Sequence, residues 1–272
     1  MNRIATTLVA SILATFAAPV AADNTALADA IAGDWRTPAN VERDRFRHPQ
    51  QTLEFFGVQP DDTVVEIIPG GGWYTEILGP YLRDEGKYIA ATWDETLPGA
   101  RSYYARLNDG LRARLADAPE VYGTPEVRTY DPAQPAFGPA GSADAVLTFR
   151  NVHNWVADDN AAEYFNAFFD VLAPGGTLGV VDHRAKPGTA LEAMKKSGYL
   201  TEELVVQLAT DAGFVLEASS EVNANPSDTA DHPNGVWTLP PTNNHDDADD
   251  AKYQAIGESD RMTLRFRKPR VE

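Results

Sequence analysis

Five histidines supply the side chains best suited to exchange a proton near neutral pH: His48, His153, His183, His232 and His245. His153 and His183 each come shortly after a run of apolar residues, and Asp182 directly precedes His183. His232 lies in a long polar segment that can fold over the same region. We therefore predict His153, Asp182, His183 and His232 as catalytic residues, and we interpret the other two histidines as surface or capping residues. For each histidine taken alone, the alternative is a structural residue that hydrogen bonds to its neighbours.

A metal site is a second interpretation of the same region. Asp182 and His183, together with Asp228, Asp231 and His232, offer oxygen and imidazole ligands. These residues have no fixed ligand spacing, and Asp-rich loops are typical of solvated turns. The chain has no cysteine, which excludes thiolate ligands, disulfides and a cysteine nucleophile. We predict no metal.

A glycine-rich turn is the strongest indication of a ligand site. The apolar run 63–67 predicts a buried strand, Glu66 lies near its end, and Gly70, Gly71 and Gly72 follow before an amphipathic helix. Glycines leave backbone N–H groups open to a ligand and allow positive φ. The alternative is a tight turn that binds nothing.

The elements that position these residues alternate along the chain. We expect further strands at 87–92, 127–130, 143–149, 177–181, 214–222 and 262–266, and helices at 50–56, 99–115, 160–172 and 201–213. Asn160 and Glu163 resemble a capping box at the start of the third of these helices. Alternating strands and helices predict an α/β fold with a mostly parallel sheet covered on both faces. Ligands bind beyond the carboxyl ends of such strands.

From Thr52 to Lys268 the sequence resembles class I S-adenosylmethionine-dependent methyltransferases. More narrowly, it resembles an exported group of predicted methyltransferases that share a Pro-Gly-Gly-Gly-Trp-Tyr-Thr turn. The segments that match best are Glu66–Thr75, Leu147–Trp155, Leu172–Val181 and Asp211–Phe214. The resemblance implies a Rossmann-like, doubly wound sheet of seven strands, mostly parallel, whose last strand is antiparallel.

The resemblance also implies roles for individual residues. Glu66 and the glycines Gly70, Gly71 and Gly72 would surround the amino-acid end of S-adenosylmethionine, Asp131 would face the adenine, and Arg150 and Asn151 would line the methionine side. The sequence departs from the family pattern twice, because Ile68 replaces the first glycine and Thr92 replaces the acidic residue that holds the ribose. We assign the ribose contact to Asp94.

An exported methyltransferase that acts on a small molecule or an envelope component is therefore the predicted function. Methyl transfer needs in-line positioning and removal of the acceptor's proton, a task suited to histidine. The departures at Ile68 and Thr92 favour an alternative, a binding or sensing module that keeps the fold but binds another ligand. A metal-dependent hydrolase is a third possibility, without a Gly-x-Ser-x-Gly motif to support it.

The amino terminus has the three parts of a secretory signal peptide: the basic start Met1-Asn2-Arg3, the apolar run 4–16, and small residues up to Ala22. We expect cleavage near Ala22, a periplasmic or secreted protein, and no lipid anchor. The predicted parts are the signal peptide 1–22, a helical segment 23–57, and the α/β domain 58–272 with a long loop at 223–260.

Charge narrows the possible partners. The net charge of -17 argues against nucleic acid and against anionic membranes. Arg43, Arg45 and Arg47 cluster in the amino-terminal segment, which is typical of a solvated face. The alternative is that one of these arginines binds an acidic group of the substrate. The sequence does not indicate an oligomeric state.

Overall fold

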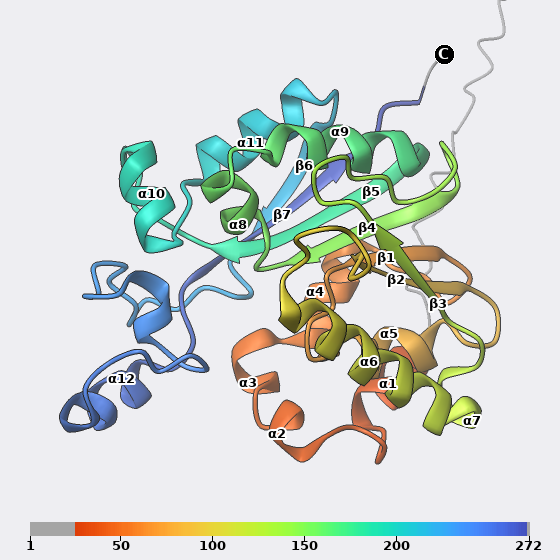
Figure 1. Ribbon diagram of the computed structural model, residues 1–272, viewed down its shortest axis with the longest axis horizontal. Helices are drawn as coiled ribbons and strands as arrows, with labels where there is room; N and C mark the ends of the chain where they lie inside the picture. Colours follow the sequence, from red (N-terminus) through yellow and green to blue (C-terminus); the bar gives the residue numbers. More distant parts are fainter. Residues whose placement is uncertain (1–24, 271–272) are drawn as a thin grey trace, which may run out of the picture.

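The computed structural model describes residues 25–270 and contains a seven-stranded sheet with helices on both faces (Figure 1). The strand order is β3-β2-β1-β4-β5-β7-β6. The strands are β1 (Thr63–Ile67), β2 (Lys87–Trp93), β3 (Glu126–Tyr130), β4 (Ala143–Phe149), β5 (Leu172–His183), β6 (Val215–Ser220) and β7 (Arg261–Arg267). Strands β1 to β5 pair in parallel, and β7 is antiparallel to both β5 and β6. The predicted fold class is confirmed. The predicted signal peptide lies outside the described residues.

Two groups of helices cover the sheet. The helices are α1 (Thr25–Ala32), α2 (Pro38–Val41), α3 (Asp44–Arg47), α4 (Pro49–Phe56), α5 (Thr75–Tyr81), α6 (Ser102–Asp117), α7 (Pro119–Tyr122), α8 (Val152–Ala157), α9 (Ala161–Val171), α10 (Leu191–Ser197), α11 (Glu202–Asp211) and α12 (Asp250–Ile256), with the 3₁₀ turns η1 (Gly235–Thr238) and η2 (Asp247–Asp249). Helices α8 to α11 lie above the sheet in Figure 1, and α1 to α7 lie below it. Each group buries its own apolar cluster against the sheet. Because β1 and β4 are covered on both sides, their sequences are continuous apolar runs.

The structure corrects several details. Strand β5 starts at Leu172 rather than Thr177, because the Pro-Gly-Gly segment continues the strand through a register shift opposite Ala143. Asn160 precedes α9 without a capping bond, because its Oδ1 accepts no hydrogen bond from a described residue, and its amide nitrogen donates to the carbonyl of Pro132. The sequence analysis missed the short helices α8 and α10. In residues 25–270 no helix combines the length and apolar content that crossing a membrane requires.

Candidate active site

The glycine turn lies between β1 and α5 and opens onto empty space. Gly70 and Gly72 have φ values of +60° and +81°, a region that side chains disfavour. The N–H groups of Gly70 and Gly71 bond to no residue within 25–270. A Cβ added at Gly70 or Gly71 would have no atom within 4 Å. The turn therefore presents free backbone donors to a cavity.

This cavity, here called the turn cavity, has a volume of about 180 Å³. Its walls come from the amino-terminal segment, the end of β1, the glycine turn and the end of β4, including Phe149, Arg150 and Asn151. Trp73 also lines it but does not fill it, because the indole is held aside by a 2.8 Å bond from Nε1 to the carbonyl of Asn40. A ligand that needs backbone donors fits here.

A second cavity of about 190 Å³, the aromatic cavity, lies beyond the ends of β2, β3 and β4. Trp93 stacks on Tyr104 at 4.2 Å between ring centroids, and both rings line it. Ile68 and Asn151 line both this cavity and the turn cavity. Asn151 is fixed by a 2.9 Å bond from its amide to the carbonyl of Ile67. Flat aromatic walls favour a planar ring as ligand.

Two residues that line the turn cavity hold an unfavourable backbone conformation. Ile68 follows β1 with φ of +52°, and Arg150 follows the neighbouring strand β4 with φ of +61°. Left-handed conformations of residues other than glycine cost about 1–3 kcal/mol and concentrate at functional sites. Ile68 thus keeps the bend for which a glycine is usual, and its side chain adds an apolar wall between the two cavities.

Glu66 lines the turn cavity and is buried. It accepts a 2.5 Å hydrogen bond from the hydroxyl of Tyr88 and a 3.4 Å bond from that of Thr75. Burial raises the pKa of Glu66 to about 7, because desolvation outweighs these hydrogen bonds and the charge of Arg47. Near neutral pH the protonation state of this carboxyl group therefore depends on the charge of the ligand that enters the cavity.

The two other predicted carboxylates bond within their own loops. Asp94 accepts hydrogen bonds from the backbone and hydroxyl of Thr96 at 2.9 and 2.7 Å, and Asp131 accepts one from the backbone of Ala133 at 2.9 Å. Neither is among the residues that line the aromatic cavity, whereas Asp158 is. Asp158 ends α8, a helix that the sequence analysis missed, so no pattern pointed to it.

The structure brings His153, Asp182 and His183 together beyond β4 and β5. Asp182 is fully buried and accepts hydrogen bonds from Nδ1 of His153 at 2.9 Å and from the backbone N–H groups of both histidines. Because a carboxylate only accepts, the proton lies on Nδ1 and Nε2 carries the lone pair. No described residue bonds to this Nε2. Asp182 thus fixes the ring of His153 and leaves Nε2 without a partner among the described residues.

The histidine rings line a third cavity of about 120 Å³, here called the histidine cavity, with Arg150, Trp237 and Pro240 among its other walls. The centroids of the two rings are 5.0 Å apart, and Nδ1 of His183 lies 2.5 Å from the hydroxyl of Ser259. Burial, followed by the neighbouring His153 and Arg150, lowers the pKa of His183 well below its usual value. His183 is therefore neutral at physiological pH.

A metal ion does not fit this cluster well. The ligand atoms of His153, Asp182 and His183 lie within 4.8 Å of one another. However, Asp182 already accepts three hydrogen bonds, and both Nδ1 atoms have partners. The two Nε2 atoms that remain are fewer than the three protein ligands usual for a catalytic metal.

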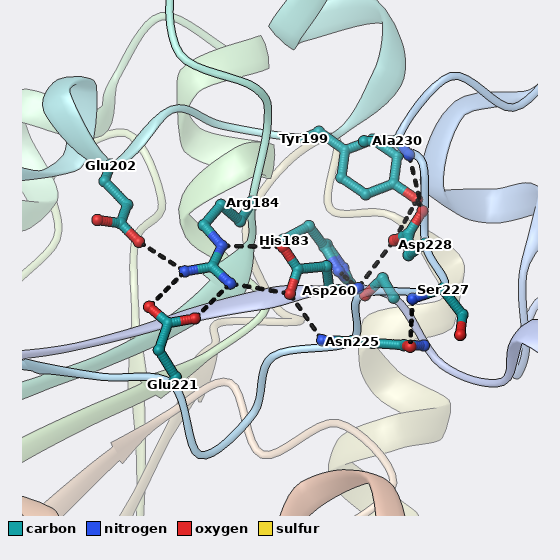
Figure 2. Close-up of polar contacts among 11 residues, drawn as sticks. His183, Arg184, Tyr199, Glu202, Glu221, Asn225, Ser227, Asp228, Ala230 and Asp260 are labelled. Carbon is teal, nitrogen blue, oxygen red and sulfur yellow. Dashed lines mark hydrogen bonds and ion pairs between the residues drawn. The ribbon is translucent and has the colours of Figure 1, made fainter.

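His232 contacts a different network, and Figure 2 shows the Asp228 and Arg184 parts of that network. Nε2 of His232 lies 2.8 Å from Asp228, which also accepts bonds from the hydroxyl of Tyr199 and the backbone of Asp260. Arg184 in turn binds Glu202, Glu221 and Asp260. These contacts fasten the 223–260 loop to the end of β5. His232 is not among the residues that line the histidine cavity.

No protein-family model matches the chain, and no curated protein matches its sequence. Solved structures do match. An S-adenosylmethionine-dependent methyltransferase from Aquifex aeolicus aligns with a TM-score of 0.55 and 15% identity over 85% of this chain and 94% of that one. An arsenic(III) S-adenosylmethionine methyltransferase from Chlamydomonas reinhardtii aligns with a TM-score of 0.52 and 14% identity over 90% of this chain and 74% of that one. The cyclase SpnF aligns with a TM-score of 0.54 and 16% identity over 91% of this chain and 93% of that one. The chain has the fold of class I S-adenosylmethionine-dependent methyltransferases.

Proposed function

We propose that this chain is an S-adenosylmethionine-dependent methyltransferase, with the methyl donor in the turn and aromatic cavities and the acceptor in the histidine cavity. The observation that carries the proposal is the free pair of N–H groups at Gly70 and Gly71, open to a cavity that shares Ile68 and Asn151 with an aromatic one. Backbone donors suit the amino-acid end of the cofactor, and stacked rings suit its adenine.

When bound, the cofactor supplies an electrophilic methyl group on a sulfonium. The chain positions the acceptor and removes its proton, since the leaving group needs no further activation. His153 suits that task because Nε2 is free and its ring lines the acceptor cavity. Asp182 holds the ring in one tautomer and stabilises the imidazolium that forms when Nε2 takes the proton.

Calorimetric titration of the purified protein with S-adenosylmethionine tests the proposal. We expect a dissociation constant in the micromolar range and competition by S-adenosylhomocysteine, since both share the groups that the two cavities suit. Absence of heat at millimolar ligand would refute the proposal.

A non-catalytic binding module with the same fold is the second candidate. The side chain of Ile68 between the cavities and the engagement of Asp94 with Thr96 support it, because both differ from the usual cofactor contacts. SpnF, a [4+2]-cyclase, illustrates that this fold serves more than one chemistry. The same titration separates the two candidates.

Replacing His153 with glutamine is expected to lower the methyl transfer rate by 10²–10⁴-fold while S-adenosylmethionine binds as before. The substitution removes the free Nε2 of His153, and it should not affect cofactor binding because His153 does not line the two donor cavities. Radiolabelled cofactor and a panel of small acceptors measure the rate. The matched control is His245→Gln, a histidine whose Nδ1 faces the backbone of Asp246. Equal rates in wild type and the His153 variant would exclude His153 as the base.

We also propose that the protein is exported and acts on a small molecule or an envelope component. Support comes from residues 1–22 alone, with their basic start, apolar run and small residues up to Ala22. Amino-terminal sequencing of protein recovered from the expressing cell tests this, and an intact Met1 would argue against export.

A further inference from the structure

Four arginines from three segments of the chain gather around one buried carboxylate. Arg43 precedes α3 and Arg47 is its last residue, Arg150 follows β4, and Arg261 begins β7. Glu258 accepts hydrogen bonds from Nε of Arg43 at 2.6 Å, from Nε of Arg47 at 3.3 Å, and from Arg261. The cluster is thus organised by tertiary contacts, unlike a solvated face.

Several guanidinium N–H groups of these arginines have no hydrogen-bond partner among the described residues. Nη2 of Arg43 and Nη2 of Arg47 are buried without a hydrogen-bond partner, and Arg47 is only 6% exposed. The guanidinium of Arg150 makes no hydrogen bond or ion pair with any residue in the described range 25–270. Burial and then the charge of Arg261 lower the pKa of Arg150 to about 10. The prediction of a solvated face holds for the exposed Arg45 and is wrong for Arg47.

Positive charge exceeds negative charge around these donors. Three carboxyl groups, Glu258, Asp182 and Glu66, interact electrostatically with these four arginines, so one positive charge of this set remains even when all three are ionised. The cofactor, with a sulfonium, an ammonium and one carboxylate, would add another. Burying uncompensated charge costs several kcal/mol, which a bound anion offsets. The excess stands out in a chain whose net charge is -17.

The position of Arg150 indicates which ligand supplies that anion. Arg150 lines both the turn cavity and the histidine cavity, whereas Arg43 and Arg47 line the turn cavity. The free amides of the glycine turn already suit the cofactor's carboxylate. Arg150 therefore lies between the proposed donor and the proposed acceptor, within the same cavity wall as the base His153.

We propose that the methyl acceptor is a small molecule with a carboxylate or phosphate group, and that Arg150 binds this oxyanion with support from Arg47 and Arg43. Guanidinium groups bind both oxyanions through paired hydrogen bonds. The proposal rests on the proposed function, because it assigns the acceptor of the same site. It excludes cationic amines as preferred acceptors, since they would add to the charge excess.

Titration of the full chain, saturated with S-adenosylhomocysteine, with inorganic phosphate and separately with malonate tests this proposal. We expect saturable binding of at least one anion, weakened at least tenfold in Arg150→Gln and partly restored in Arg150→Lys. The matched control is Arg112→Gln, which removes an exposed arginine paired with Glu95 and should leave binding unchanged. Thermal melting of each variant establishes that it is folded. Comparing phosphate with malonate identifies the preferred oxyanion.

Three results would overturn the proposal: binding of neither anion, equal weakening in the Arg112 variant, or displacement of the anion by S-adenosylhomocysteine. The last would assign the arginines to the cofactor's own carboxylate. If the chain binds no S-adenosylhomocysteine, the proposed function fails, and the same anion titration of the cofactor-free protein decides on the Arg150 site independently.

Discussion

Gly70→Leu is expected to weaken S-adenosylmethionine binding at least 100-fold while the protein stays folded. The new side chain would occupy open space at the turn cavity, which Gly70 lines, because a Cβ at this position has no atom within 4 Å. It would cover the free N–H groups and take the volume that the methionyl end needs. Backbone strain at φ of +60° adds about 1–2 kcal/mol to the cost of folding. Calorimetric titration measures the affinity, and thermal melting measures the stability.

Gly141→Leu is the matched control. Gly141 also has a positive φ, +70°, and open space around its Cβ position, but it precedes β4 at the opposite edge of the sheet. Both variants carry the same strain, so they should lose similar stability. A loss of affinity in the Gly141 variant as large as in the Gly70 variant would show that strain, rather than occupation of the cavity, weakens binding.

Glu258→Gln is expected to destabilise the protein by about 3–5 kcal/mol, because it leaves buried arginines without their shared counter-charge. Glu258 is 2% exposed and bonds to three of them. Urea unfolding near pH 7 measures the effect. The control is Glu217→Gln, which removes a carboxylate that pairs with Arg265 and Arg267 at the surface and should cost about 0–1 kcal/mol.

The stabilisation by Glu258 should also depend on pH. Burial alone would raise its pKa, but the charges of Arg261, Arg47, Arg43 and Arg150 hold the pKa well below the usual 4.5. A carboxyl group with a depressed pKa in the folded state contributes its full stabilisation above the unfolded value and loses it as pH falls below that value. The stability difference between wild type and the glutamine variant should therefore begin to shrink as pH falls below about 4.5, and it should keep shrinking until pH falls through the depressed folded-state pKa. A constant difference between them at every pH would contradict this assignment.

The fold and the meeting of the catalytic candidates were predictable because both follow from the order of strands. His153 follows β4 and His183 ends β5; these strands are parallel neighbours, so the positions of both histidines at one edge were implied by alternation alone. The glycine turn was predictable for the same reason. At Gly70 the backbone has a positive φ and open space beside it, as the role assigned to the glycine requires.

The remaining contacts depend on side-chain directions that no local pattern specifies. Glu258 meets Arg43 across a separation of 215 residues, in loops without hydrophobic periodicity. Asp158 reaches the aromatic cavity from the end of a helix of six residues, too short for periodicity to reveal. His232 was predicted near His153 because its loop is long enough to reach that region. In the structure the ring of His232 contacts Asp228, a residue of the same loop.

The 223–260 loop has a consequence for how this protein can diversify. Trp237 and Pro240, both in that loop, form part of the wall around the histidine cavity, whereas the turn and aromatic cavities are lined by residues outside it. Substitutions in this single insertion can reshape the space for the acceptor and leave the donor contacts intact. Selection on acceptor choice and selection on cofactor affinity can then act on separate stretches of the gene.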